Sequence, residues 1–119
     1  MSLTDHVMTA DEVKATKRQI EYEGIPKMLF SPDQWKEIES GRKHELDVKI
    51  YAKLDYTASQ MKEIRLGLDK GVDVSAFVNP EFSDKQMREI RRGVEAGLDV
   101  SSYANPDMSA GEMRKAFLP

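Results

Sequence analysis

Residues 56–81 of the chain read YTASQMKEIRLGLDKGVDVSAFVNPE, and residues 82–107 read FSDKQMREIRRGVEAGLDVSSYANPD. The two stretches align without a gap at a period of 26 residues. Such self-similarity is typical of repeat proteins, in which each unit buries its apolar face against its neighbours. Residues 30–55 are a more divergent copy in the same register, and residues 108–119 begin another. The sequence therefore predicts about 3.5 repeats of 26 residues.

Each copy opens with the pattern of a helix start. A Ser or Thr stands at its second position and a Gln or Glu follows three residues later, as in a capping box. The residue before the cap and the fourth residue after it are large and apolar, as in a hydrophobic staple. The caps and their partners are Ser31 and Gln34, Thr57 and Gln60, Ser83 and Gln86, and Ser109 and Glu112. Four helix starts are predicted.

The residues after each cap predict a helix with one apolar stripe. In the second copy, Met61, Ile64 and Leu68 recur at the spacing of one helix face. Gly71 and Gly97 then stand where a residue in the left-handed conformation commonly ends a helix. The first copy has Glu45 at this place, so we expect that helix to end differently.

A glycine also recurs inside each predicted helix, as Gly41, Gly67 and Gly93. A glycine in mid-helix costs up to about 1 kcal/mol relative to alanine, so its recurrence indicates a use. We expect close approach of a neighbouring helix or of the short turn that follows. The alternative is access to the backbone for a partner.

A shorter signal follows each predicted helix. It reads Leu46-Asp47-Val48, Val72-Asp73-Val74 and Leu98-Asp99-Val100 in the three copies. An aspartate cap between apolar residues predicts a short helical turn, which the Asn-Pro pairs at 79–80 and 105–106 would end. A strand is the alternative, because apolar residues alternate with polar ones from residue 46 to residue 50.

The predicted fold is all-α: a single domain over residues 1–119, built as a short tandem array of helical hairpins. The repeats are 30–55, 56–81 and 82–107, and residues 108–119 form a C-terminal half-repeat. Residues 1–29 are expected to hold a tail and an N-terminal capping helix from about 10 to 22. These terminal segments would cover the open faces of the array.

Composition narrows the classes of function. The 119 residues carry a net charge of −3 and include no cysteine, which excludes disulfides and thiolate sites. No apolar run reaches the roughly 20 residues of a membrane span, and the N-terminus lacks a secretory signal. His6 and His44 have no motif partner, and no phosphate-binding loop or metal-ligand spacing occurs. We therefore expect a cytoplasmic protein that is not an enzyme, with no cofactor and no metal.

The string QMxEIRxG[LV]xxG[LV]DVSx[FY] at residues 60–77 and 86–103 resembles a tandem helical repeat of uncharacterised bacterial proteins. Repeats of this kind are found in mobile-element proteins of Firmicutes. The resemblance covers residues 56–107 well, residues 30–55 and 108–119 in part, and residues 1–29 not at all. It implies an accessory or inhibitor protein of a mobile genetic element.

The leading hypothesis is a non-catalytic protein–protein interaction module, a monomer or weak homodimer with an unknown protein partner. Repeat arrays bind through the face left exposed when their units stack. The candidate contacts are Lys62, Leu66, Arg88 and Arg92.

The second hypothesis is a nucleic-acid-binding protein that uses an arginine-bearing helix face. Arg65 and Arg91 would then contact nucleic acid or an acidic partner, together with Arg88 and Arg92. The alternative for Arg65 is an aliphatic stem over the core and an ion pair with Asp69 or Asp73. The net charge of −3 favours the protein-binding hypothesis, because general nucleic-acid binders are usually basic.

Overall fold

The computed structural model describes residues 25–117, and all regular structure in that range is helical. Its α-helices are α2 (Pro32–Lys43), α3 (Ala58–Asp69), α4 (Asp84–Glu95) and α5 (Ala110–Phe117). Its 3-10 helices are η2 (Lys27–Leu29), η3 (Val48–Ile50), η4 (Val74–Ala76) and η5 (Val100–Ser102). The short helices are thus confirmed, and the strand alternative is wrong for these residues. Asp73 and Asp99 cap their short helices as predicted, but the Asp47 side chain makes no cap hydrogen bond. The predicted capping helix near residues 10–22 lies outside the described residues.

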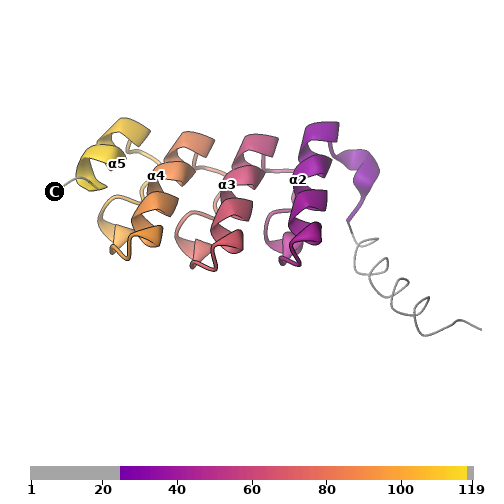
Figure 1. The fold of residues 1–119 in the computed structure, drawn as a ribbon. Coiled ribbons are helices and arrows are strands. Elements are labelled where there is room, and N and C mark those ends of the chain that lie inside the picture. The colour runs from indigo at the N-terminus through magenta and orange to yellow at the C-terminus, as the bar shows by residue number, and fades with distance from the viewer. Residues whose placement is uncertain (1–24, 118–119) are drawn as a thin grey trace, which may run out of the picture.

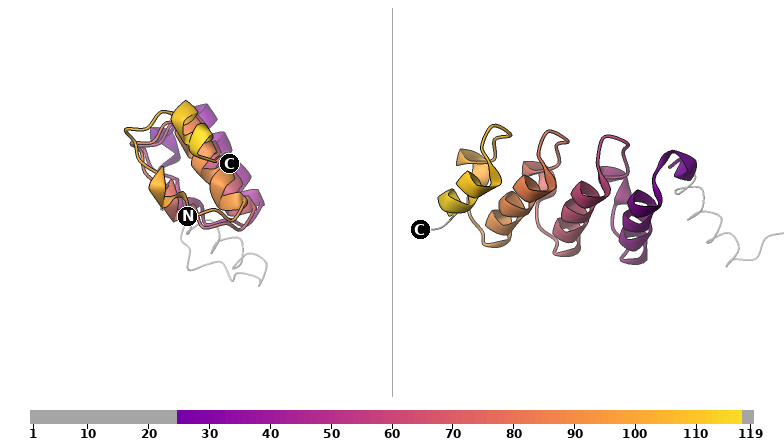
Figure 2. Two further views of the ribbon diagram at one scale, coloured as in Figure 1. Left: turned by 90° about the vertical axis from the view of Figure 1, so that its left-hand side faces the viewer. Right: turned by 90° about the horizontal axis from the view of Figure 1, so that it is seen from above.

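The four α-helices stand side by side in chain order, and each packs against the next (Figure 1). The chain leaves each of α2, α3 and α4 through a tight turn into a 3-10 helix and then crosses to the following α-helix. An end-on view shows the α-helices in one layer and the connecting segments in a second layer (Figure 2). Within residues 25–117, one face of the α-helical layer therefore carries no second layer of helices.

The predicted capping boxes are confirmed at the starts of α2, α3 and α4. In α3, the Thr57 hydroxyl accepts from the Gln60 amide at 3.1 Å, and the Gln60 side chain accepts from the Thr57 amide at 2.8 Å. Ser109 and Glu112 make the same two bonds at the start of α5, at 3.1 and 3.3 Å. Local sequence thus fixes where each helix begins.

The helix ends follow the prediction at the glycines. Gly71 and Gly97 have positive φ angles of 70° and 77°. Glu45 also has a positive φ, of 58°, so the first copy ends in the same way and the expected difference is not found. A non-glycine residue is uncommon in this conformation, and Glu45 carries local backbone strain there.

The glycines inside the helices lie against the following short helix, as expected. A Cβ atom placed on Gly67 would lie 2.8 Å from the Phe77 ring and 2.9 Å from the Val74 side chain. Gly41 and Gly93 face a tyrosine and a valine at the equivalent places. The short helix therefore packs directly on the backbone of the long one, and no side chain fits between them.

The core runs without a break along the array, between the two layers. It joins the staple residues at the helix starts, the apolar stripe of each helix and the aromatic residue that follows each short helix. Its fully buried large side chains are Ile38, Tyr51, Met61, Ile64, Phe77, Met87, Ile90 and Met113. Each unit contributes to this core, and burial of such side chains is the main stabilising term.

The capping glutamines also bind the next unit, a contact that the sequence pattern within one repeat does not predict. The side-chain amide nitrogen of Gln60 donates to the carbonyl oxygens of Pro80 and Phe82, at 3.2 and 2.6 Å. Gln86 donates in the same way to Pro106 and Met108, at 2.9 and 2.6 Å. Each of these side chains therefore caps its own helix and holds the turn that leads into the following helix.

We predict that Gln86→Glu destabilises the protein by about 2 kcal/mol, because the carboxylate keeps the capping box but cannot donate to the two carbonyls. Urea unfolding followed by circular dichroism measures this change. Acidification should reduce the loss, since a protonated carboxyl regains a donor. Glu112→Gln is the matched control at the equivalent position of α5 and should cause no loss. Equal stability of Gln86→Glu and the wild type would contradict the interpretation.

A second prediction concerns the glycines. Gly67→Ala should destabilise by about 1–3 kcal/mol, because its Cβ meets the packed Val74 and Phe77 side chains. Gly111→Ala in α5 is the control: its Cβ meets nothing closer than the Ser109 hydroxyl at 3.8 Å. Alanine is the better helix former, so stability should stay or rise there. Thermal unfolding of both variants decides, and a stable Gly67→Ala would show that the contact yields.

Candidate interaction surface

The exposed side of the α-helical layer carries a row of basic side chains. The fifth residue after each helix cap is basic and exposed in all four helices: Lys36, Lys62, Arg88 and Arg114. Packed helices lie roughly 8–10 Å apart, so the row offers a cation at each such step. We refer to these four residues as the basic row. Comparing all four copies at this position would have added Lys36 and Arg114 to the sequence candidates.

The structure places the predicted partner contacts on this side of the array. Lys62 is exposed, and Leu66 is half-buried one helical turn further along α3. Arg88 is half-exposed, and its Nε donates to Glu63 Oε1 at 3.1 Å. Arg92 is half-exposed too, with its guanidinium 3.7 Å from Glu89 Oε1 and 5.9 Å from the centre of the Phe117 ring. Unlike the two arginines, Lys62 and Leu66 make no side-chain ion pair or ring contact within the described residues.

Arg65 and Arg91, in contrast, lie in the interfaces between helices. Their side chains are only 13% and 12% exposed. Arg65 Nε donates to Glu37 Oε2 of the preceding helix at 2.7 Å, and its Nη1 lies 3.9 Å from Asp69. The expected ion pair with Asp69 is therefore found, but the main partner is Glu37. Asp73, the other expected partner, accepts from the Ser75 amide instead.

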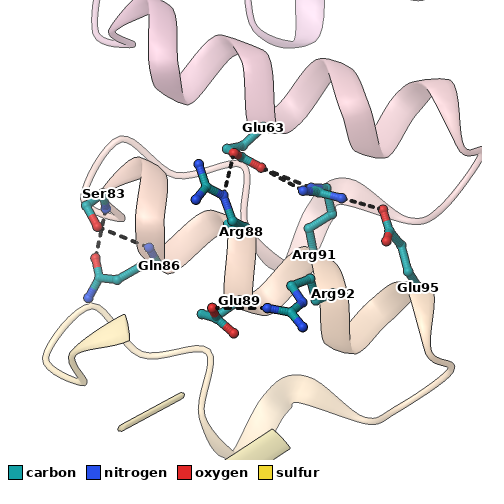
Figure 3. Close-up of polar contacts among 8 residues, drawn as sticks. All are labelled: Glu63, Ser83, Gln86, Arg88, Glu89, Arg91, Arg92 and Glu95. Atoms are coloured by element: carbon teal, nitrogen blue, oxygen red, sulfur yellow. Dashed lines mark hydrogen bonds and ion pairs between the residues drawn. The ribbon is translucent and has the colours of Figure 1, made fainter. Parts of the chain in front are cut away.

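Glu63 receives two arginines from the following helix, as Figure 3 shows. The Glu63 side chain is 3% exposed, with Oε1 bound by Arg88 and Oε2 by Arg91 Nη2 at 3.0 Å. Arg91 Nη1 also pairs with Glu95 at 2.7 Å. Burial lowers the pKa of Arg91, but the bonds to Glu95 and Glu63 raise it by more. The pKa of Arg91 is therefore above its usual value. The charges of Arg65 and Arg91 are thus used to join helices.

This series of ion pairs is interrupted between α4 and α5. Glu89 occupies the same place in α4 as Glu63 in α3, but Phe117 stands where the next arginine would be. Among the residues that the structure describes, Glu89 Oε2 is buried and has no hydrogen-bond partner. Burial raises the pKa of the nearby Tyr103, and the charge of Glu89 raises it as well. Glu89 is therefore a buried carboxylate that is only half satisfied.

A small open cavity lies beside Glu89, between α4 and α5. It measures about 190 Å³ and is lined by Lys85, Arg88, Glu89, Ala110, Gly111 and Arg114. We call it the α4–α5 cleft. Small-molecule sites usually measure about 300–1,000 Å³, so this cleft suits a single side chain better than a cofactor. Three of its six lining residues are cationic.

His44 contacts the neighbouring helix. His44 ends α2, and its Nδ1 lies 3.0 Å from Asp69 Oδ2 of the next helix. His6 lies outside the described residues. Within residues 25–117, no three His, Asp or Glu side chains come together as a metal site would require. In the same part of the chain, no helix has the length and apolarity needed to cross a membrane.

Searches against protein-family models, curated proteins and solved structures return no match to this chain. The evidence for a function therefore lies in the exposed surface of the array. That surface combines the basic row, the half-buried Leu66 and the α4–α5 cleft on one side of the helical layer.

We predict opposite effects for two equivalent glutamates. Glu63→Gln should destabilise by about 2 kcal/mol, because it weakens two charge-assisted hydrogen bonds in a buried place. Glu89→Gln should leave stability unchanged or raise it, because it removes a buried charge that lacks one partner. Urea unfolding of the two variants gives the comparison. An equal loss in both would mean that Glu89 is satisfied in solution.

Proposed function

We propose that the chain is a non-catalytic protein–protein interaction module, built as a tandem array of helical hairpins that binds through the exposed side of its α-helices. The observation that carries this proposal is the basic row. Within the described residues, Lys36, Lys62 and Arg114 make no ion pair, so the packing of the array does not explain them. An exposed face that presents one basic side chain on each helix suits an extended partner.

The sequence resemblance supports a more specific role. We propose an accessory or inhibitor protein of a mobile genetic element, which acts in the cytoplasm on a protein partner. The chain would act as a monomer. At its outer end, α5 exposes Glu112, Lys115 and Ala116 where the inner helices bury glutamine, glutamate and isoleucine. These side chains make the exposed face of α5 less apolar than the inner interfaces, which disfavours the packing of a second copy against it.

Nucleic-acid binding is the second candidate function, and the basic row is the observation that favours it. Arg65 and Arg91 support it less than expected, because both guanidiniums are engaged with carboxylates and mostly buried. Binding to phosphates would release counterions and weaken steeply as salt rises. Salt dependence and nuclease treatment therefore separate the two candidates.

We predict that the immobilised chain retains a protein from lysate of its source cells, and that nuclease and moderate salt leave this retention intact. The double variant Lys62→Glu/Leu66→Ser should reduce retention at least about tenfold, which corresponds to roughly 1.4 kcal/mol. Lys49→Glu on the exposed side of η3 is the matched control and should retain the partner. Circular dichroism checks that both variants are folded.

Retention that disappears with nuclease would overturn the protein-binding proposal in favour of nucleic acid. Retention that the double variant leaves unchanged would place the binding surface elsewhere on the array.

A further inference from the structure

We infer that the partner binds the array through an extended acidic segment, and that one of its carboxylates enters the α4–α5 cleft. The inference rests on the proposed protein-binding function and specifies the chemistry of the partner. Three observations carry it: the charges that line the cleft, the size of the cleft, and the residues that the cleft shares with the basic row.

The charges of the cleft favour an anion. Lys85 and Arg114 make no ion pair within the described residues, and Arg88 shares Glu63 with Arg91. The negative charge of Glu89 is offset by Arg92, which lies 3.7 Å from Oε1. The walls therefore carry an excess of positive charge, and a cationic side chain of a partner would be repelled. A carboxylate would accept hydrogen bonds from Lys85 and Arg114 at the rim.

The size and the position of the cleft favour an acidic side chain of a peptide over a free anion. A cavity of about 190 Å³ accepts one such side chain, and Gly111, which lines it, adds no side chain of its own. Glu89 Oε2 is buried and out of reach of a partner, so the cations at the cleft carry the recognition. Arg88 and Arg114 line the cleft and also belong to the basic row, so a segment with repeated acidic side chains reaches both, whereas a free anion reaches the cleft alone.

The spacing expected for packed helices points to the form of the segment. Such helices lie roughly 8–10 Å apart, so we expect the cations of the row to recur at about that distance. A polyproline II segment rises about 3.1 Å per residue with three residues per turn, so every third side chain recurs at about 9.3 Å. A carboxylate at every third residue therefore meets successive members of the row.

The test is an amide NMR titration of the full chain with a synthetic peptide of four Glu-Pro-Pro triplets. A second peptide of the same composition has its four glutamates adjacent, and a single-stranded oligothymidine of equal charge serves as the nucleic-acid probe. We expect the spaced peptide to bind most tightly of the three. The largest shifts should fall on the amides of Gly111 and its neighbours around the cleft.

Variants locate the carboxylate. Lys85→Gln and Arg114→Gln should each weaken the spaced peptide about fivefold, because each removes one partly exposed ion pair. Neither residue has an ion-pair partner within the described part of the chain, so folding should be kept. Lys49→Gln, with the same loss of charge on η3, should change nothing. Arg88 is left intact because it binds Glu63.

The direction in which Glu89→Gln changes the affinity for the spaced peptide decides between an anion and a cation in the cleft. If an acidic side chain enters the cleft, removing the negative charge of Glu89 should tighten the spaced peptide. Weaker binding of this variant would show that the cleft takes a cation, and would overturn the inference. Tighter binding of the oligothymidine, or no shifts at millimolar peptide, would overturn it as well. The proposed function would survive that failure if Lys62→Glu/Leu66→Ser still abolished retention of the lysate protein.

Discussion

The structure depends on a glutamine in each inner unit, Gln60 or Gln86, whose side-chain amide makes hydrogen bonds through both its oxygen and its nitrogen. Its oxygen closes the capping box of its own helix, and its nitrogen holds the turn that enters the next helix. Gln60 and Gln86 are both buried, so loss of either bond would leave a polar atom without water. One residue thus sets the start of a helix and the distance to its neighbour. The core and the register of all surface residues follow from that distance.

This fixed register divides the charges into two groups. Residues that face the neighbouring helix, such as Glu63 and Arg91, satisfy each other and hold the units together. Lys36, Lys62 and Arg114 of the basic row are exposed, make no ion pair among the described residues and remain available. Arg88 is the exception, because it also binds Glu63. The other three positions can therefore vary without disturbing the core. An array built in this way separates stability from recognition, which suits a binding module.

Much of the fold could be predicted from the sequence because its signals are local. Capping boxes, left-handed glycines and the short helices each depend on residues within one unit, and all were confirmed. The second bond of Gln60 and the pairing of Arg65 with Glu37 were not predicted, because both cross between units. Residues about 22 and 28 positions apart meet only once the helices stack. The half-satisfied state of Glu89 also appears only in three dimensions, although Phe117 marks it in the alignment of copies.

The glutamine bond has a direction, since each unit donates to the one after it. Glu112 has no amide to donate, and Lys115 stands where a glutamate would receive arginines. A helix packed on the exposed side of α5 would therefore not find the groups that join α3 to α4. Inner units can still be gained or lost without changing those contacts. Each inner unit gained would lengthen the exposed surface by one helix spacing. The number of inner units therefore sets the length of partner segment that the array can bind.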